Sequence, residues 1–280
     1  MSILKKVLSF EGEVGVRNPG PVLIEYDDDI VQKYHEGVTL ADFSGRRVQW
    51  NTATAGAWGA VKGFVAGGVS AAKSGALQST AEEMVNTFNK ERNAPGIKLL
   101  QIAAEVNGVV PPEIQCVFAK TTEQLSSLKL DKVHELMTKL GVAQRWQVHD
   151  GVLGAASIAQ VNPVTKLEGD GAAYVVKFRY PGLTTDSVRH NAEQAITAFA
   201  ALSRMTEQTG GKKMPKLTNI LRPFAKEVVH EINLRREVEN IITFDRKRRA
   251  LDTALPVVIP QVEEYSQLHI VMGSINGTSL

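Results

Sequence analysis

Lys177 stands inside an otherwise apolar stretch, residues 174–178, and it is the side chain from which chemistry is most readily inferred. A cation in an apolar strand costs desolvation free energy unless an anion lies close to it. Before this stretch the chain has a turn of small residues and then an apolar run that contains Val161. The residues of the turn are Gly154, Ala155, Ala156, Ser157 and Ile158.

Small side chains let backbone N–H groups approach anionic oxygens closely, although alanine restricts a turn more than glycine does. Together, the lysine and the turn predict a site for a phosphate-bearing ligand, with Lys177 as its cation and residues 154–158 as a lid. Two plainer interpretations stay open: a strand lysine whose charge reaches solvent, and a tight turn that binds nothing.

Length and composition fit a folded chain with a sizeable core, since 43% of the 280 residues are hydrophobic. The 32 basic and 30 acidic residues nearly balance, so net charge gives no support for a nucleic-acid partner. Cys116 is the sole cysteine, which excludes an internal disulfide and favours an intracellular, reducing compartment. The scattered histidines form no ligand spacing with Cys116, so no metal site is predicted.

No apolar run reaches the roughly 18 residues that a membrane-spanning helix needs. The first ten residues are basic and apolar but are followed at once by Glu11 and Glu13, so neither a signal peptide nor a well-formed transit peptide is the favoured interpretation. A mitochondrial location and a peripheral position at a membrane both stay open.

Residues 1–92 are expected to form an amino-terminal extension that is partly helical. Apolar residues recur at helical spacing within the Ala- and Gly-rich segment 51–80. These residues are Trp58, Val61, Phe64, Val65 and Val69. Such a stripe packs on its own domain, or it rests on a membrane surface or on a partner helix.

From residue 93 onward the pattern is regular and predicts an α+β fold. Turn and capping signals predict helices over about 95–106, 112–126, 131–140, 185–208 and 217–249. Alternating apolar residues predict strands over about 144–150, 157–164, 172–180, 261–265 and 268–273.

In their order, these motifs resemble the UbiB/ADCK group of atypical kinases, which is linked to ubiquinone and other prenylquinone biosynthesis. The resemblance covers residues 93–280, as helices over 93–141 and a kinase-like small lobe over 142–280. The group has an alanine-rich loop where ordinary kinases have glycines, and here that loop is 154–161. Its strand Val-Lys-Val-Gln-Tyr-Pro-Gly is similar to residues 176–182.

Further motifs of the group have counterparts with departures. Its Lys-x-Gly-Gln helix corresponds to Lys98 and Gln101, with Leu100 in place of the glycine. Its long helix carries Glu-x-Asp, then a glutamate and an asparagine, and the counterparts here are Glu231, Asn233, Glu237 and Asn240. Asn233 replaces the aspartate, so an ionic contact becomes a weaker hydrogen bond.

The resemblance implies a small lobe with a five-stranded antiparallel sheet and long helices that binds ATP or ADP. Lys177 would hold the α- and β-phosphates, with Glu237 orienting it. The hinge residues that would meet adenine are Met272, Gly273, Ser274 and Ile275. The helix with Lys98 and Gln101 would fold over the site, which disfavours protein substrates.

The magnesium-binding and catalytic-loop residues of a large lobe do not follow the hinge in this sequence. The large lobe is therefore expected to be absent, and Mg²⁺ is expected to bind only if another chain supplies such a lobe.

Expected partners are an adenine nucleotide and lipid or quinone-biosynthesis partners at a membrane surface. The basic run 246–249 suits a helix end in solvent or a contact with anionic lipid. Two other functions stay open: a non-catalytic nucleotide- or partner-binding pseudokinase module, and a helical membrane-surface scaffold.

Overall fold

The computed structural model describes residues 7–8, 20–37, 42–44, 74–90, 93–106, 110–119, 127–169, 171–208, 223, 226–251 and 257–275. The apolar stripe expected between Trp58 and Val69 lies outside these residues. The chain forms two compact units, each assembled from separated parts of the sequence. Unit 1 comprises residues 1–44, 127–183 and 230–280, and unit 2 comprises residues 45–126 and 184–229.

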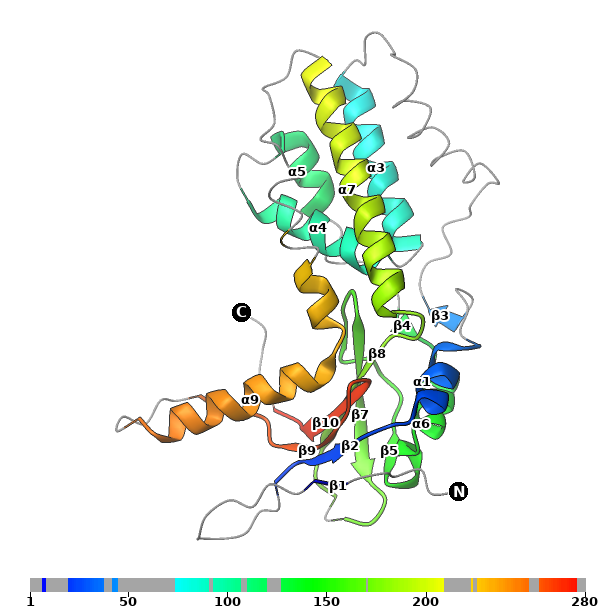
Figure 1. Ribbon diagram of the computed structural model, residues 1–280, viewed down its shortest axis with the longest axis vertical. Helices are drawn as coiled ribbons and strands as arrows, with labels where there is room; N and C mark the ends of the chain where they lie inside the picture. The colour runs from blue at the N-terminus through cyan, green and yellow to red at the C-terminus, as the bar shows by residue number, and fades with distance from the viewer. Residues whose placement is uncertain are drawn as a thin grey trace. The chain divides into compact units, whose positions relative to one another are not determined.

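Unit 1 is built on a mixed sheet (Figure 1). Five antiparallel strands lie in the order β9-β10-β8-β7-β5 and correspond to the five strands that the sequence predicts. Their bounds are β5 Trp146–Val148, β7 Ala159–Lys166, β8 Tyr174–Arg179, β9 Val262–Tyr265 and β10 His269–Gly273. This part of the chain is the small lobe of a protein-kinase-like α+β fold.

The amino-terminal region extends this sheet, which the sequence did not reveal. Strand β2 (Val22–Ile24) pairs in parallel with β9, and β1 (Val7–Leu8) pairs with β2. Strand β6 (Gly154–Ala155) pairs with β7 alone, and β3 (Phe43–Ser44) pairs with β4 (Ser127–Leu128) as a separate ribbon. The described part of the extension therefore contains strands as well as helices.

The strand register decides which side chains share a face of the sheet. Lys177 on β8 lies directly between Val161 on β7 and Ile270 on β10. Directly opposed residues project to the same face. Ile270 is buried in a cluster with Leu234 and Val238, which belong to α9 (Leu234–Arg249). Helix α9 therefore covers the face that carries Lys177 (Figure 1).

Local signals explain where the smaller helices of unit 1 begin and end. Asp27 caps α1 (Asp28–His35) by accepting a hydrogen bond from the Ile30 N–H at 2.9 Å. Helix α6 (Leu130–Lys139) packs against α1 and stops at Gly141, whose φ of 66° favours glycine. The short helix η4 (Val142–Gln144) then leads into β5.

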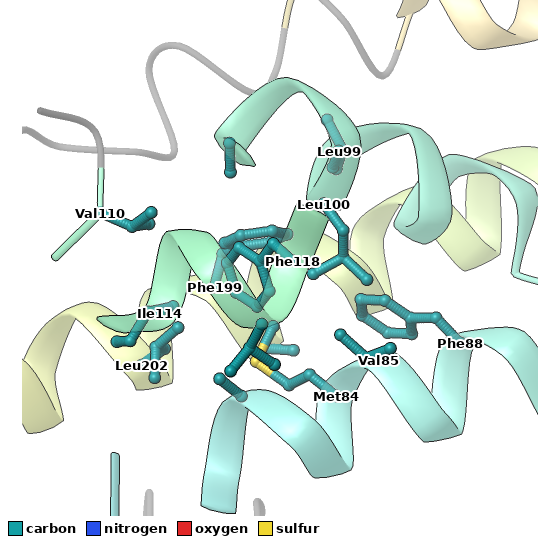
Figure 2. Close-up of a cluster of buried hydrophobic side chains, with 14 of the residues drawn as sticks. Met84, Val85, Phe88, Leu99, Leu100, Val110, Ile114, Phe118, Phe199 and Leu202 are labelled. Atoms are coloured by element: carbon teal, nitrogen blue, oxygen red, sulfur yellow. The ribbon is translucent and has the colours of Figure 1, made fainter. Parts of the chain in front are cut away.

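The described part of unit 2 is helical, and its helices share one apolar core. The helices are α3 (Ser74–Lys90), α4 (Ala94–Glu105), α5 (Pro112–Ala119) and α7 (Thr185–Gln208), with α3 and α7 side by side (Figure 1). Asn93 begins α4 by accepting a hydrogen bond from the Gly96 N–H at 2.7 Å. Phe88, Leu100, Phe118 and Phe199 meet in the core (Figure 2).

The single helix predicted over 217–249 is wrong in one respect that matters for the site. The helical segment 226–231 ends before Ile232, and α9 begins only at Leu234. Ile232 and Asn233 lie between them, and Asn233 caps α9, since its side-chain oxygen accepts from the Arg235 N–H at 3.1 Å. An asparagine stabilises a helix start better than a helix interior, so the break falls there.

Candidate functional site

Lys177 and Glu237 form a two-pronged ion pair between β8 and α9. The Nζ atom of Lys177 lies 2.8 Å from Oε1 and 2.7 Å from Oε2 of Glu237, although the two residues are 60 positions apart. The side chains keep 22% and 38% of their surface exposed. The structure therefore brings together the two groups that the sequence singled out, in a place that solvent reaches.

Helix α9 is held in position at its first turn, which carries Glu237. The Leu234 N–H donates to the Gln267 carbonyl at 3.2 Å, and Leu234 and Val238 are buried against the sheet. Glu237 therefore faces the strand from a fixed helix start. A carboxylate in the first turn of a helix is also favoured by the helix dipole.

The predicted lid is a tight hairpin between β6 and β7. The Ala156 N–H donates to the Ala159 carbonyl at 2.8 Å, which leaves Ser157 and Ile158 at the tip. Ile158 is buried, and its carbonyl accepts from the Tyr180 N–H at 2.9 Å. Gly154 pairs with Val161, which itself lies opposite Lys177, so the lid and the lysine share one row across the sheet.

The predicted hinge segment begins inside β10. Gly273 donates its N–H to the Gln261 carbonyl at 2.9 Å, and Ser274 donates its N–H to the Ala173 carbonyl at 3.0 Å. Met272 packs against the cluster beneath α9, whereas Ile275 is exposed. Because the two N–H groups are engaged within the sheet, an adenine would have to bond to other backbone groups of this segment.

The residues of the family motifs are divided between the two units. Lys98 and Gln101 lie on α4 of unit 2 and are half-buried. Glu231 is an exposed residue of unit 1, just before the helix break. Asn240 is exposed on α9, and Asn233 serves as a helix cap. The role predicted for each of these residues at a site stays a prediction.

A buried polar network on the opposite face of the sheet was missed by sequence reasoning. Arg145 makes two hydrogen bonds to Glu264, at 2.8 and 3.0 Å, and His269 lies 3.3 Å from Glu264 and 2.8 Å from the Ser266 hydroxyl. Burial alone would raise the pKa of Glu264, but hydrogen bonds from His269 and Arg145 outweigh it and lower that pKa to about 2. Arg145 and Glu264 are 119 positions apart, so no local pattern announces their contact.

A second cation on this face of β8, Arg179, lies two residues after Lys177 and is buried, with only 6% of its surface exposed. Its Nη1 atom donates to the Ile232 carbonyl at 2.7 Å. The signal that could have found it is the alternation of β8, which directs a charged residue toward the covered face.

Membrane spans and metal sites can be judged for the residues that the structure describes. Among them, no helix is both long and apolar enough to cross a membrane. They also contain no group of three or more His, Cys, Asp or Glu residues that could hold a metal ion.

An antiparallel sheet whose third predicted strand carries a lysine, paired with a helix glutamate, defines a protein-kinase-like small lobe. Comparison with protein families agrees: residues 119–280 match the ABC1 atypical kinase-like domain. This match spans more than half of the chain, so the chain belongs to the ABC1 atypical kinase-like family, which confirms the resemblance inferred from its motifs.

Comparison with curated proteins gives no match. Among solved structures, the chain is similar to Rv3197 of Mycobacterium tuberculosis, determined in complex with erythromycin. The two are 21% identical, with a TM-score of 0.32 over 80% of this chain. The chain spans about half, 49%, of that structure's length.

Proposed function

We propose that this chain forms the ATP-binding amino-terminal part of an atypical kinase or ATPase of the UbiB/ADCK type that supports ubiquinone (prenylquinone) biosynthesis. The observation that carries the proposal is the contact of Lys177 with both carboxylate oxygens of Glu237. In kinases a strand lysine paired with a helix glutamate holds the nucleotide phosphates, and both groups have to be in place.

The donor count of Lys177 supports a phosphate at this position. An ammonium group has three N–H donors. Glu237 takes two of them, and in the described part of the chain no other hydrogen bond from Nζ is found. The partial exposure of both side chains gives an anion from solution access to the third donor. Lys177 would therefore bind phosphate oxygens without leaving Glu237.

The surroundings of Lys177 suit the remainder of a nucleotide. Gly154, Val161 and Lys177 form one row across three strands, which places the lid backbone roughly 10 Å from β8. A Cβ atom added to Gly154 would meet no atom within 4 Å, so the space above the lid is open. Met272 shares this face with Lys177, because it lies opposite Val175. In the proposal, residues 154–158 cover the phosphates and residues 272–275 meet the adenine.

The proposal is tested by isothermal titration calorimetry of the full chain with ATP and ADP, with and without Mg²⁺. We expect Lys177→Ala to abolish the binding heat and Gly154→Val to weaken it, because the first removes the phosphate donor and the second fills the open space. Lys166→Ala is the matched control, since it removes an equal charge from an exposed position on the neighbouring strand β7. Equal heats from the wild-type chain and Lys177→Ala would remove the nucleotide-site proposal.

Nucleotide binding and turnover are separate outcomes. A chain that binds ATP but releases no phosphate would be a nucleotide-binding pseudokinase module rather than an active ATPase. The link to prenylquinones rests on family resemblance, which does not fix function by itself. It is tested by measuring prenylquinone content in cells that lack the gene, complemented with the wild-type sequence or with the Lys177→Ala form. An unchanged quinone content in the deletion strain would refute the link.

A lipid partner is favoured by the carboxyl-terminal end of α9. Phe244 and Leu251 are each 53% exposed there, beside the basic run 246–249. Asp245 pairs with Arg248 and Arg249 at 2.9 and 2.7 Å, which leaves Arg246 and Lys247 outside these ion pairs. Exposed apolar side chains next to cations are typical of contact with an anionic membrane surface.

This lipid proposal is tested by sedimentation with vesicles of phosphatidylcholine, alone or mixed with phosphatidylglycerol. We expect binding only to the anionic vesicles, and we expect Phe244→Ser combined with Lys247→Gln to reduce it strongly. Lys166→Gln, an exposed lysine on β7, is the control for loss of charge. Binding that is unaffected by the double change would assign the contact to another surface.

A further inference from the structure

Arg179 is a buried charge without a counter-ion among the described residues. It is the last residue of β8, only 6% exposed, and none of the ion pairs in the described part of the chain includes it. Its Nε atom is buried and has no hydrogen-bond partner there. A buried guanidinium without a carboxylate is costly, so neutral acceptors have to compensate for its charge.

Those acceptors come from two segments that are far apart in the sequence. The Nη1 atom donates to the Ile232 carbonyl at 2.7 Å, and the Nη2 atom lies 3.0 Å from Nε2 of His35 at the end of α1. The Tyr34 hydroxyl donates to the backbone carbonyl of Arg179. Two consecutive residues of α1 therefore contact this one arginine.

The Ile232 carbonyl lies at the break between the helical segment 226–231 and α9. Carbonyl groups at a helix end lack partners within the helix and need an outside donor. The side chain of Asn233 satisfies an N–H group of α9, whereas Arg179 satisfies a carbonyl on the other side of the break. Arg179 thus ties the break to β8, and the direction in which α9 leaves the break depends on this tie.

Arg179 and Lys177 give α9 two attachments to one strand. Both side chains project from the same face of β8, because they are two residues apart. Arg179 holds the chain just before α9, and Lys177 meets Glu237 in the first turn of α9. With the first attachment fixed, Glu237 can reach Lys177 only in a narrow range of positions.

His35 completes this arrangement from α1. Its Nε2 atom faces Arg179, and its Nδ1 atom lies 3.0 Å from the Gly182 N–H. The Gly182 N–H donates to Nδ1 and the guanidinium of Arg179 presents a donor to Nε2; a neutral imidazole accepts at one nitrogen at a time, and the charged donor makes the stronger bond. The ring thereby meets the guanidinium at Nη2, while the Ile232 carbonyl meets it at Nη1.

We propose that Arg179 is a positioning residue that fixes the start of α9 and so holds Glu237 against Lys177, and that His35 makes the amino-terminal helix α1 part of the same support. An effect of Arg179 on nucleotide affinity would rest on the proposed function. The positioning of Glu237 by Arg179 does not rest on it.

The test compares Arg179→Met, which keeps length without a donor, with Arg179→Lys, which keeps one charged donor. Two readouts use the nucleotide-free full chain: hydrogen exchange of the α9 backbone by mass spectrometry, and the rate at which an amine-acylating reagent modifies Lys177. Removing a hydrogen bond from a charged group should raise exchange in residues 234–238 by about tenfold or more in the Met variant. Lys177 should become several-fold more reactive, while exposed Lys166 should not change. Arg179→Lys should restore most of both signals.

Unchanged exchange in residues 234–238 of the Met variant would overturn the proposal. Exchange that rises equally throughout the β7–β8 hairpin would also overturn it, because that pattern marks general destabilisation. If Arg179→Met does not fold, His35→Ala decides the question with the same two readouts and smaller expected changes. A wild-type chain that binds no nucleotide would refute the proposed function and leave these outcomes valid.

Discussion

The substitution Leu100→Gly, which would create the glycine of the Lys-x-Gly-Gln motif that the sequence resembles, should destabilise unit 2 severely. The Leu100 side chain is fully buried on α4 in a core shared with α3, α5 and α7 (Figure 2). Truncating a buried leucine to alanine costs about 2–5 kcal/mol. Glycine in a helix interior costs about 1 kcal/mol more than alanine. The expected loss for Leu100→Gly is therefore roughly 3–6 kcal/mol, a large part of the roughly 5–15 kcal/mol that stabilises a typical domain.

The assay is urea unfolding followed by far-ultraviolet circular dichroism, which reports the helices. Hydrogen exchange of α4 and α5 then assigns the loss to unit 2. Gln101→Gly is the matched control, because it introduces the same backbone freedom at a half-buried position of the same helix. The difference between the two variants isolates the cavity. If Leu100→Gly lost no more stability than Gln101→Gly, the assignment of Leu100 to the core would be wrong.

Three further predictions concern other parts of the molecule. Gly96→Ala should lower the melting temperature, because the added Cβ atom would lie 2.7 Å from the Phe88 ring, and this clash outweighs the better helix propensity of alanine. A stabilised variant would contradict the close approach of α3 and α4. The folded-state pKa of Glu264 is about 2 against an ordinary value of 4.5, so the contribution of Glu264 to the free energy of unfolding is present above pH 4.5 and is lost as pH falls toward 2, at about 1.4 kcal/mol per pH unit. Glu264→Gln should therefore flatten the pH dependence of stability in this range, measured by urea unfolding. An unchanged slope would refute the lowered pKa of Glu264. A double-mutant cycle of Lys177→Met and Glu237→Gln should give a coupling free energy of about 1 kcal/mol or less in unfolding experiments, since the pair is partly exposed. A much larger coupling would mean that the pair serves mainly to stabilise the fold.

The strands of the small lobe could be predicted because each carries its own signal. Residues 174–179 and 269–273 are short apolar runs bounded by turn residues, and the structure has β8 and β10 there. Strands β1 and β2 could not be predicted in this way. They are two and three residues long, and β2 exists through its pairing with β9, which lies far away in the sequence.

The helix break at Ile232 was missed because the residues on both sides continue one helical pattern. Asn233 is a weak signal by itself, since asparagine also occurs on exposed helix faces. What makes it a cap is the combination of its bond to the Arg235 N–H with the bond from Leu234 to Gln267. The second of these contacts is set by the tertiary fold, so the sequence could not show it.

The pairing of Lys177 with Glu237 was predicted from the order of motifs and not from local spacing. Sixty positions separate the two residues, and either one alone reads as an ordinary surface charge. The hinge shows the limit of that approach. A motif identified residues 272–275, but only the structure shows that the N–H groups of Gly273 and Ser274 are engaged within the sheet.

Two cations on one face of β8 have different environments, and the difference separates binding from support. Lys177 keeps 22% of its side chain exposed and has a donor beyond the two that Glu237 takes, so an anion from solution can reach it. Arg179 is 6% exposed and bonds to a backbone carbonyl, so no ligand reaches it without opening the α9 start. A nucleotide that binds here would therefore contact the charge of Lys177 directly, whereas Arg179 would act only by holding Glu237 in position. Substitutions at Lys177 should therefore lower nucleotide affinity directly, whereas substitutions at Arg179 should first lower the hydrogen-exchange protection of the α9 start.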